Sequence, residues 1–295
     1  MKIGIAGTGK MGTAIGARLL ELKQEVHVWN RSAARTRPLV DQGAASAAMP
    51  VELAGRCDAV LTILTDAAAI DAVYNGKDGL LSGDVRGKLF IEMSTVSSTT
   101  ERALAPAVAA RGAVIVECPV GGSTAPAREG KLFGFLGGGD TDVARARPIV
   151  EQLCRRVEHV GPIGAGAAMK HAINLPLAVY WQVFGEALGL VDSLGLPPQR
   201  LVDIFSDTSG GPNMLKPLGP NIAQALGGDI AVGVFFDVDS VRKDLRTMLE
   251  EGRAQGKPMP LVTKALDLYD RASAAGLGAR NCTTLLPYWL KHGQS

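Results

Sequence analysis

The chain opens with the stretch Lys2-Ile3-Gly4-Ile5-Ala6-Gly7-Thr8-Gly9-Lys10-Met11-Gly12, and this stretch decides the fold. Its first five residues are a short, mostly apolar run that is typical of a buried strand. Gly7, Gly9 and Gly12 then fit the pattern Gly-x-Gly-x-x-Gly, and a helical pattern follows at Met11–Leu22. In that context the first glycine permits a tight turn, the second lets backbone approach a pyrophosphate, and the third allows close helix–strand packing. The stretch therefore predicts a dinucleotide-binding βαβ unit.

The first half of the chain continues to alternate short apolar runs with spacers of helical length. This alternation predicts repeated βα units and a mostly parallel, doubly wound sheet of the Rossmann type. The further strands are expected at Glu25–Trp29, Ala59–Leu64, Leu89–Met93, Val114–Glu117 and Leu132–Leu136.

The pattern changes at Gly161-Pro162-Ile163-Gly164-Ala165-Gly166, and long helical segments follow. We expect helices at Ala167–Leu194, Pro198–Asp207, around Gln224, Val241–Gln255 and Pro260–Ala275. The sequence thus predicts a Rossmann domain over residues 1–162 and an all-α domain over residues 163–295. A long interdomain helix should join them.

Composition excludes several classes of protein. The 295 residues are 46% apolar, and 31 basic against 29 acidic side chains give a net charge of +2. So small a charge argues against general binding to nucleic acid or membrane surfaces. Four scattered cysteines without Cys-x-x-Cys spacing predict neither a metal site nor disulfides. Without a signal-peptide pattern or an uninterrupted apolar run of membrane-spanning length, we expect a cytoplasmic protein.

The residues after the second strand should select the cofactor. An NAD site would place an acidic residue there for the ribose hydroxyls, but the chain has Asn30-Arg31-Ser32, with Arg35 one helical turn later. Two guanidinium groups can bind a 2′-phosphate through charge-assisted hydrogen bonds, so NADP(H) is favoured. The alternative is that Arg31 and Arg35 are solvated surface charges.

The long helix carries the candidate catalytic pair, Lys170 and Asn174. Spaced i,i+4, they share one helix face near the domain boundary. Apolar neighbours would partly desolvate the lysine, which suits an ammonium group that releases a proton as a general acid. A lysine at such a position, taken alone, is more often a surface residue with its stem packed on the protein. The pairing of Lys170 with Asn174 near the domain boundary favours the catalytic interpretation.

These motifs, in this order, resemble the β-hydroxyacid dehydrogenase family, typified by 3-hydroxyisobutyrate dehydrogenases and tartronate semialdehyde reductases. The similarity runs over nearly the whole chain. The matching segments are Gly7–Gly12, Thr65-Asp66, Met93–Val96, Pro119–Gly122, Gly166–Lys170 with Asn174, and Phe236 with Lys243–Leu245.

The resemblance implies an NADP-dependent oxidoreductase acting on CH–OH groups of small β-hydroxyacids or reducing the matching aldehyde acids. Lys170 would be the general acid/base, and Asn174 would orient the substrate or the lysine. The cofactor would contact Gly7, Thr8, Gly9, Lys10, Met11, Gly12, Asn30, Arg31, Ser32, Arg35, Leu64, Thr65, Ser94, Thr95, Phe236 and Lys243. The substrate would contact Thr95, Val120, Gly121, Gly122, Ser123, Lys170 and Asn174. Family members are commonly homodimers or homotetramers.

The substrate loop departs from the family pattern. The family usually has Asp-x-Pro-Val-Ser-Gly-Gly, whereas this chain has Glu117-Cys118-Pro119-Val120-Gly121-Gly122-Ser123. The serine that helps hold a substrate carboxylate has become Gly121. The altered loop argues weakly for a first alternative, an imine reductase. A second alternative, from a different class, is an NADP-binding interaction module without turnover. Lys170 argues against the first, and the retained pair of Lys170 and Asn174 argues against the second.

Overall fold

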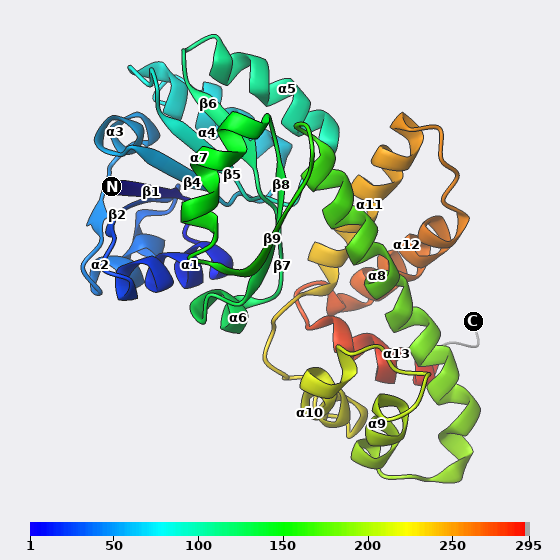
Figure 1. Ribbon diagram of the computed structural model, residues 1–295. Helices are drawn as coiled ribbons and strands as arrows, with labels where there is room; N and C mark the ends of the chain where they lie inside the picture. The colour runs from blue at the N-terminus through cyan, green and yellow to red at the C-terminus, as the bar shows by residue number, and fades with distance from the viewer. Residues whose placement is uncertain (293–295) are drawn as a thin grey trace. The chain divides into compact units, whose positions relative to one another are not determined.

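The computed structural model describes residues 1–292, and the chain divides into two units, Met1–Ala172 and Ile173–Ser295 (Figure 1). The division falls inside the long helix α8 (Ala165–Val191), which is continuous. The domain boundary predicted at residue 162 remains a prediction.

A single sheet forms the centre of the first unit, with strand order β3-β2-β1-β4-β5-β6-β8-β7 and β9 paired to β8. Strands β1 to β6 pair in parallel, β8 runs antiparallel to β6 and β7, and β9 is parallel to β8. The strands are β1 (Lys2–Ala6), β2 (Glu25–Trp29), β3 (Ala45–Ser46), β4 (Ala59–Thr62), β5 (Leu89–Glu92), β6 (Val114–Glu117), β7 (Val120–Gly121), β8 (Leu132–Gly137) and β9 (Cys154–Gly161).

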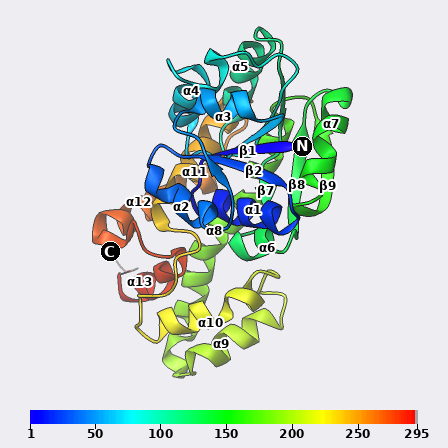
Figure 2. The ribbon, with the colours of Figure 1, turned by 90° about the vertical axis from the view of Figure 1, so that its left-hand side faces the viewer.

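Alternating apolar side chains bury both faces of this sheet. Ile5 and Ile91 belong to one apolar cluster, whereas their neighbours Ala6 and Phe90 belong to the other. Helices α3 (Pro50–Arg56), α4 (Ala67–Asn75) and α5 (Ser98–Ala109) cover one face; α1 (Lys10–Glu21) and α7 (Asp140–Val150) cover the other (Figures 1 and 2). The unit also contains α2 (Arg37–Val40), α6 (Thr124–Arg128) and the short turns η1 (Ala33–Thr36) and η2 (Leu80–Ser82). This two-sided burial is the expected arrangement of a parallel sheet.

The doubly wound fold is confirmed, and the predicted strands lie within two residues of the observed ones. The sequence missed β3, β7 and β9. The first two are only two residues long, too short to show a period. Strand β9 reads Cys-Arg-Arg-Val-Glu-His-Val-Gly, and its middle residues are exposed or half-buried. Such a polar edge strand lacks the apolar run by which the others were recognised.

The second unit is helical, and no strand occurs in it among residues 173–292 apart from an isolated bridge between Asp237 and Asn281. After α8 come η3 (Asp192–Leu194), α9 (Pro198–Ser206), α10 (Leu215–Leu226), α11 (Val238–Ala254), α12 (Pro260–Ala272), η4 (Ser273–Leu277), η5 (Cys282–Thr284) and α13 (Leu285–His292). Trp181, Phe184 and Tyr269 are fully buried in its core. Among the described residues, no helix is long and apolar enough to cross a membrane.

Candidate active site

The glycine-rich turn between β1 and α1 has the backbone geometry that a nucleotide loop requires. Gly7 has φ +101°, and a Cβ there would lie 2.2 Å from the Ile63 carbonyl oxygen. A Cβ on Gly12 would lie 1.9 Å from the Gly7 carbonyl oxygen, so the helix packs directly on the turn. Gly9 differs, because a Cβ added there would meet no heavy atom within 4 Å. Gly7 and Gly12 thus permit close packing of the turn and helix, whereas Gly9 borders open space.

That open space lies at the N-terminus of α1. Gly9 is the N-cap residue, no side chain caps the helix, and its first turn holds no acidic residue. By contrast, Asp66 caps α4 and Ser97 caps α5 through side-chain oxygens. An uncapped helix N-terminus offers backbone N–H groups and a positive dipole end to an anion. The turn therefore fits the pyrophosphate of a dinucleotide.

The turn after β2 is bonded directly to this loop. Asn30 Oδ1 accepts the Thr8 backbone N–H at 3.1 Å, and the Thr8 hydroxyl donates to the Arg35 carbonyl oxygen at 3.0 Å. Arg31 and Arg35 themselves are exposed, as is Ser32. Arg31 and Asn30 help to line a cavity of about 550 Å³, together with Trp29 and residues 46–50. The sequence-predicted cofactor-selecting residues are thus brought beside the glycine-rich turn.

The next two loops of the sheet are joined by Ser94, which follows β5. Its hydroxyl accepts the Leu64 backbone N–H at 2.8 Å and donates to Glu92 Oε2 at 3.2 Å. Thr65, which follows Leu64, donates to Asp66 at 3.1 Å. The Ser94 side chain is therefore part of a link between the two loops. This link holds the backbone of Leu64–Thr65 and Ser94–Thr95 at the carboxyl edge of the sheet.

Glu92, which sequence reasoning missed, anchors this link. It is fully buried and accepts hydrogen bonds from the Ser94 N–H and the Thr62 hydroxyl. Burial raises the pKa of the Glu92 carboxyl to about 7, although those hydrogen bonds oppose the shift. It was not recognised because a single acidic residue ending an apolar strand has no periodic signature.

The predicted substrate loop begins at the end of β6, and its residues pair with β8. Val120 lies opposite Gly134 and Gly121 opposite Phe133. Gly122 has φ +124°, and Ser123 is the N-cap residue of α6, without a side-chain cap bond. Cys118 is fully buried, and burial raises the pKa of its thiol well above the ordinary range, so it is a packing residue.

Lys170 lies on α8, and only 9% of it is exposed. Asn174 follows four residues later on the same helix and is half-buried. The division between the units falls after Ala172, so Lys170 belongs to the first unit and Asn174 to the second. The first turn of α8 is bonded to Glu117, the last residue of β6. Lys170 is therefore held close to the carboxyl edge of the sheet that carries the glycine-rich turn.

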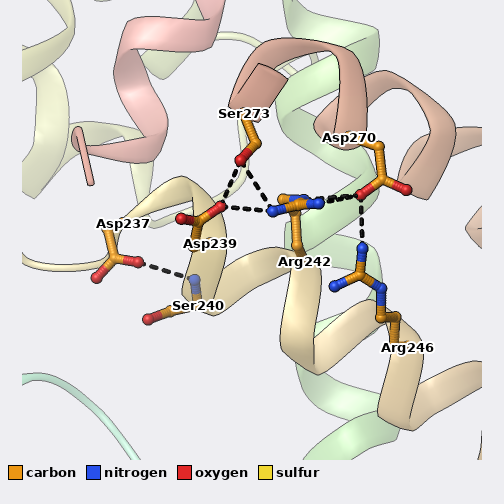
Figure 3. Close-up of polar contacts among 7 residues, drawn as sticks. All are labelled: Asp237, Asp239, Ser240, Arg242, Arg246, Asp270 and Ser273. Carbon is orange, nitrogen blue, oxygen red and sulfur yellow. Dashed lines mark hydrogen bonds and ion pairs between the residues drawn. The ribbon is translucent and has the colours of Figure 1, made fainter. Parts of the chain in front are cut away.

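Phe236 and Lys243 lie in the second unit, just before and within α11. Figure 3 shows how this helix is fixed: Arg242 binds Asp239 and Ser273 at 2.7 and 2.8 Å, and its Nε donates to Asp270 at 2.7 Å. Arg246 adds a bond to the same Asp270 oxygen at 2.8 Å. These contacts tie α11 to α12 and η4. The sequence did not reveal this network, because its members come from separate segments.

Asn281, in the second unit, has a structural role. It is fully buried, donates to the Gly233 carbonyl oxygen and accepts from the Thr283 N–H. The Cys282 N–H donates to the Phe236 carbonyl oxygen at 2.9 Å. The segment containing Phe236 is thus pinned from both sides.

Known proteins resemble this chain along its whole length. Residues 2–161 match the family model described as the NAD binding domain of 6-phosphogluconate dehydrogenase, and residues 164–289 match that described as NAD-binding of NADP-dependent 3-hydroxyisobutyrate dehydrogenase. Glyoxylate/succinic semialdehyde reductase 1 of Arabidopsis thaliana is 31% identical, with 94% of each chain covered. 3-Hydroxyisobutyrate dehydrogenase of Pseudomonas aeruginosa is 32% identical, with 90% of each covered.

The fold comparison agrees. The solved structure of Mycobacterium tuberculosis 3-hydroxyisobutyrate dehydrogenase with L-serine has a TM-score of 0.85 and 26% identity, covering 100% of this chain and 99% of that one. A parallel sheet with a glycine-rich turn before an uncapped helix is typical of a dinucleotide-binding domain, and the matching families are nicotinamide-dependent oxidoreductases. Within that class, the chain belongs to the β-hydroxyacid dehydrogenase family, and the predicted resemblance is confirmed.

Proposed function

We propose that the protein is an NADP(H)-dependent reductase of small aldehyde acids, able to run in reverse as a β-hydroxyacid dehydrogenase. The observation that carries this proposal is the placement of Lys170, nine-tenths buried on a helix whose first turn is bonded to the carboxyl edge of the nucleotide-binding sheet. The names of the two relatives above support aldehyde acids and hydroxyacids as substrates.

Reduction of an aldehyde adds a hydride to carbon and a proton to oxygen. NADPH, when bound, supplies the hydride. The Lys170 ammonium donates the proton to the developing alkoxide and stabilises its negative charge. Asn174, one helical turn further along α8, orients the substrate or the lysine.

The cofactor would be held by the residues predicted from the sequence. Backbone N–H groups of α1 would bind the pyrophosphate, and the exposed Arg31 and Arg35 would bind the 2′-phosphate. The loops at Leu64–Thr65 and Ser94–Thr95 would contact the nicotinamide side. We keep Phe236 and Lys243 as further cofactor contacts and Val120–Ser123 as substrate contacts. We also propose that the protein is cytoplasmic and forms a homodimer or homotetramer.

The decisive experiment is Lys170→Ala. General acid catalysis contributes about 10²- to 10⁴-fold, so kcat should fall by that factor while the Kd for NADPH stays near the wild-type value. Lys170→Arg should not restore activity, because a guanidinium group does not release a proton readily. Asn174→Ala is a milder change, since orientation rather than proton supply is lost.

NADPH consumption should first be screened against glyoxylate, succinic semialdehyde, methylmalonate semialdehyde, tartronate semialdehyde and a cyclic imine. Turnover of the imine alone would favour the imine reductase alternative. NADPH binding without turnover of any compound would favour the interaction module. Wild-type kcat in Lys170→Ala on the best aldehyde acid would contradict the mechanism.

A further inference from the structure

Glu117, the last residue of β6, makes an unusual connection to the helix that carries Lys170. Its side chain is fully buried, and its carboxylate accepts three backbone N–H groups. Oε1 accepts from Gly164 at 2.6 Å and from Gly166 at 2.8 Å, and Oε2 accepts from Ala167 at 3.2 Å. Because α8 begins at Ala165, this one carboxylate satisfies donors of its first turn that have no partner within the helix.

Glycines enclose this carboxylate. A Cβ on Gly137, which pairs with Glu117 across the sheet, would lie 2.1 Å from Glu117 Oε1. A Cβ on Gly166 would lie 2.5 Å from the Phe135 carbonyl oxygen and 3.2 Å from the Glu117 Cδ. Gly164 has φ +97°, which favours glycine for conformational reasons. The sequence indicated the run Gly161–Gly166 only as the point where the pattern of strands ends. In the structure, this run and Gly137 form the binding site of the Glu117 carboxylate.

The groups around the Glu117 carboxylate favour its ionised form, whereas burial favours its protonated form. The three N–H bonds and the nearby Arg102 guanidinium lower the pKa of the carboxyl, whereas burial raises it, and the net shift is upward. Arg102 lies close to this carboxylate-binding site, since a Cβ on Gly164 would be 2.6 Å from the Arg102 Nη1. A carboxylate at a helix N-terminus is further stabilised by the helix dipole.

We propose that Glu117 is a positioning residue for Lys170, holding the first turn of α8 so that the ammonium group meets the substrate oxygen. This inference rests on the proposed function. Lys170 follows Ala167, the last bonded residue, by three positions, less than one helical turn. A shift of this turn therefore moves the ammonium group almost equally, and a misplacement of about 1 Å can lower a catalytic rate about 10²-fold.

A double-mutant cycle tests the proposal. Glu117→Gln keeps the volume of the side chain but removes the charge and presents an NH₂ group to one of the backbone donors. In the wild-type background it should lower kcat about 10- to 100-fold on the best aldehyde acid of the screen. In the Lys170→Ala background it should change kcat less than about threefold, because residues that act as a unit are not additive. The Kd for NADPH should stay within about threefold in every variant.

Glu101→Gln is the matched control. Glu101 is equally buried on α5, and its Oε2 has no hydrogen-bond partner among the described residues. Burial raises the pKa of the Glu101 carboxyl well above its usual range, so glutamine imitates its neutral form. The backbone N–H groups of Gly164–Ala168 donate to Glu117, Pro162 and Gly164 rather than to Glu101. Glu101→Gln should therefore keep kcat within about twofold of wild type if only positioning matters.

The outcomes separate this proposal from the proposed function. If Lys170→Ala retains wild-type kcat, the proposed function fails and the role of Glu117 falls with it. If Lys170→Ala is impaired but Glu117→Gln lowers kcat by the same factor in both backgrounds, only the positioning role is overturned. A solvent deuterium isotope effect on kcat that rises in Glu117→Gln supports it, since a displaced donor slows proton transfer. An unchanged isotope effect with reduced kcat indicates mere loss of folded enzyme and overturns it.

Amide hydrogen exchange provides a test that needs no turnover. Glu117→Gln should speed exchange in a peptide covering residues 164–172, while a peptide covering β1 and α1 stays protected. Gly137→Ala should act in the same direction, because its Cβ would displace Glu117 Oε1. Unchanged exchange over residues 164–172 in both variants would overturn the proposal.

Discussion

The N-termini of α1 and α8 offer the same kind of anion-binding groups, but only the N-terminus of α8 is occupied by a side chain of the protein. Each begins with backbone N–H groups that have no partner within the helix, and with a positive dipole end, beside the carboxyl edge of the sheet. At α8 the protein fills the site itself, with the buried carboxylate of Glu117. At α1 no side chain caps the helix, and Gly9 borders open space. The difference supports the proposal that the N-terminus of α1 binds the cofactor, whereas the N-terminus of α8 is closed by a side chain of the protein itself.

Gly9→Asp would place a carboxylate at the N-terminus of α1, as Glu117 does at α8. Among the variants proposed, we expect it to have the largest effect on NADPH binding. Gly9 has φ −70° and ψ −168°, so aspartate fits there and can cap the helix. Stability should be unchanged or rise by about 1 kcal/mol. A carboxylate in the phosphate position should weaken NADPH binding at least about 100-fold, because it replaces a charge-assisted contact of roughly 3 kcal/mol with repulsion.

Gly9→Ala is the control for Gly9→Asp, since it adds a Cβ without charge. Fluorescence titration with NADPH and thermal unfolding on the same preparations distinguish the two. Wild-type affinity in Gly9→Asp would show that the phosphates bind elsewhere.

Buried carboxylates in the first unit should make stability fall as pH rises. The pKa of Glu92 is about 7 in the folded protein against 4.5 ordinarily, so between these values only the folded state keeps the proton. The free energy of unfolding therefore decreases through this window, by about 3 kcal/mol at 1.36 kcal/mol for each pKa unit. Glu101 and Glu117 have pKa values shifted in the same direction.

Urea unfolding at pH 5.5 and pH 8 measures this dependence. Glu92→Gln should reduce it. Glu52→Gln should leave it unchanged, because the half-buried Glu52 has a lowered pKa that matters only at more acidic pH. Equal wild-type stability at the two pH values would contradict the assignment of Glu92.

Arg31 should extend the open site at α1 toward a 2′-phosphate. Losing one charge-assisted bond costs about 1.5–3 kcal/mol, so Arg31→Ala should weaken NADPH binding roughly 10- to 150-fold and leave NADH almost unchanged. The exposed Arg37, which pairs with Asp41, is a suitable control. Equal losses for both cofactors in titrations of Arg31→Ala would contradict NADP selection by this residue.

The sequence predicted the open helix end far better than the filled one. Gly7, Gly9 and Gly12 form a local motif, and residues adjacent in sequence suffice to build it. The binding site of the Glu117 carboxylate is formed by β6, β8 and the turn before α8, and these three segments are far apart in the sequence. No periodicity links Glu117 to Gly137 or Gly164. The same holds for Arg242 and Asp270 in the second unit. Local turns and alternating strands are therefore readable, whereas contacts made by pairing distant segments are not.

The predicted substrate loop, four residues beyond Glu117, is where we expect the smallest and most selective effect. A Cβ on Gly121 would lie 3.7 Å from Phe133 Cβ and 3.8 Å from Phe135, which is ordinary contact. The serine usual in the family is therefore sterically permitted here, and its absence removes a hydroxyl rather than relieving a clash. Gly122 differs, because its φ is +124° and a Cβ would lie 2.8 Å from Leu132 Cδ2.

Gly121→Ser should consequently fold as stably as wild type, whereas Gly122→Ser should lower the melting temperature. One added hydrogen bond is worth about 0.5–1.5 kcal/mol, so the KM of Gly121→Ser for a carboxylate-bearing aldehyde such as succinic semialdehyde should fall about two- to tenfold. The Kd for NADPH should not change, because the α1 end is untouched. An unchanged KM in a stably folded Gly121→Ser would show that position 121 does not face the substrate, and would remove this loop from the proposed site while leaving the two helix ends as described.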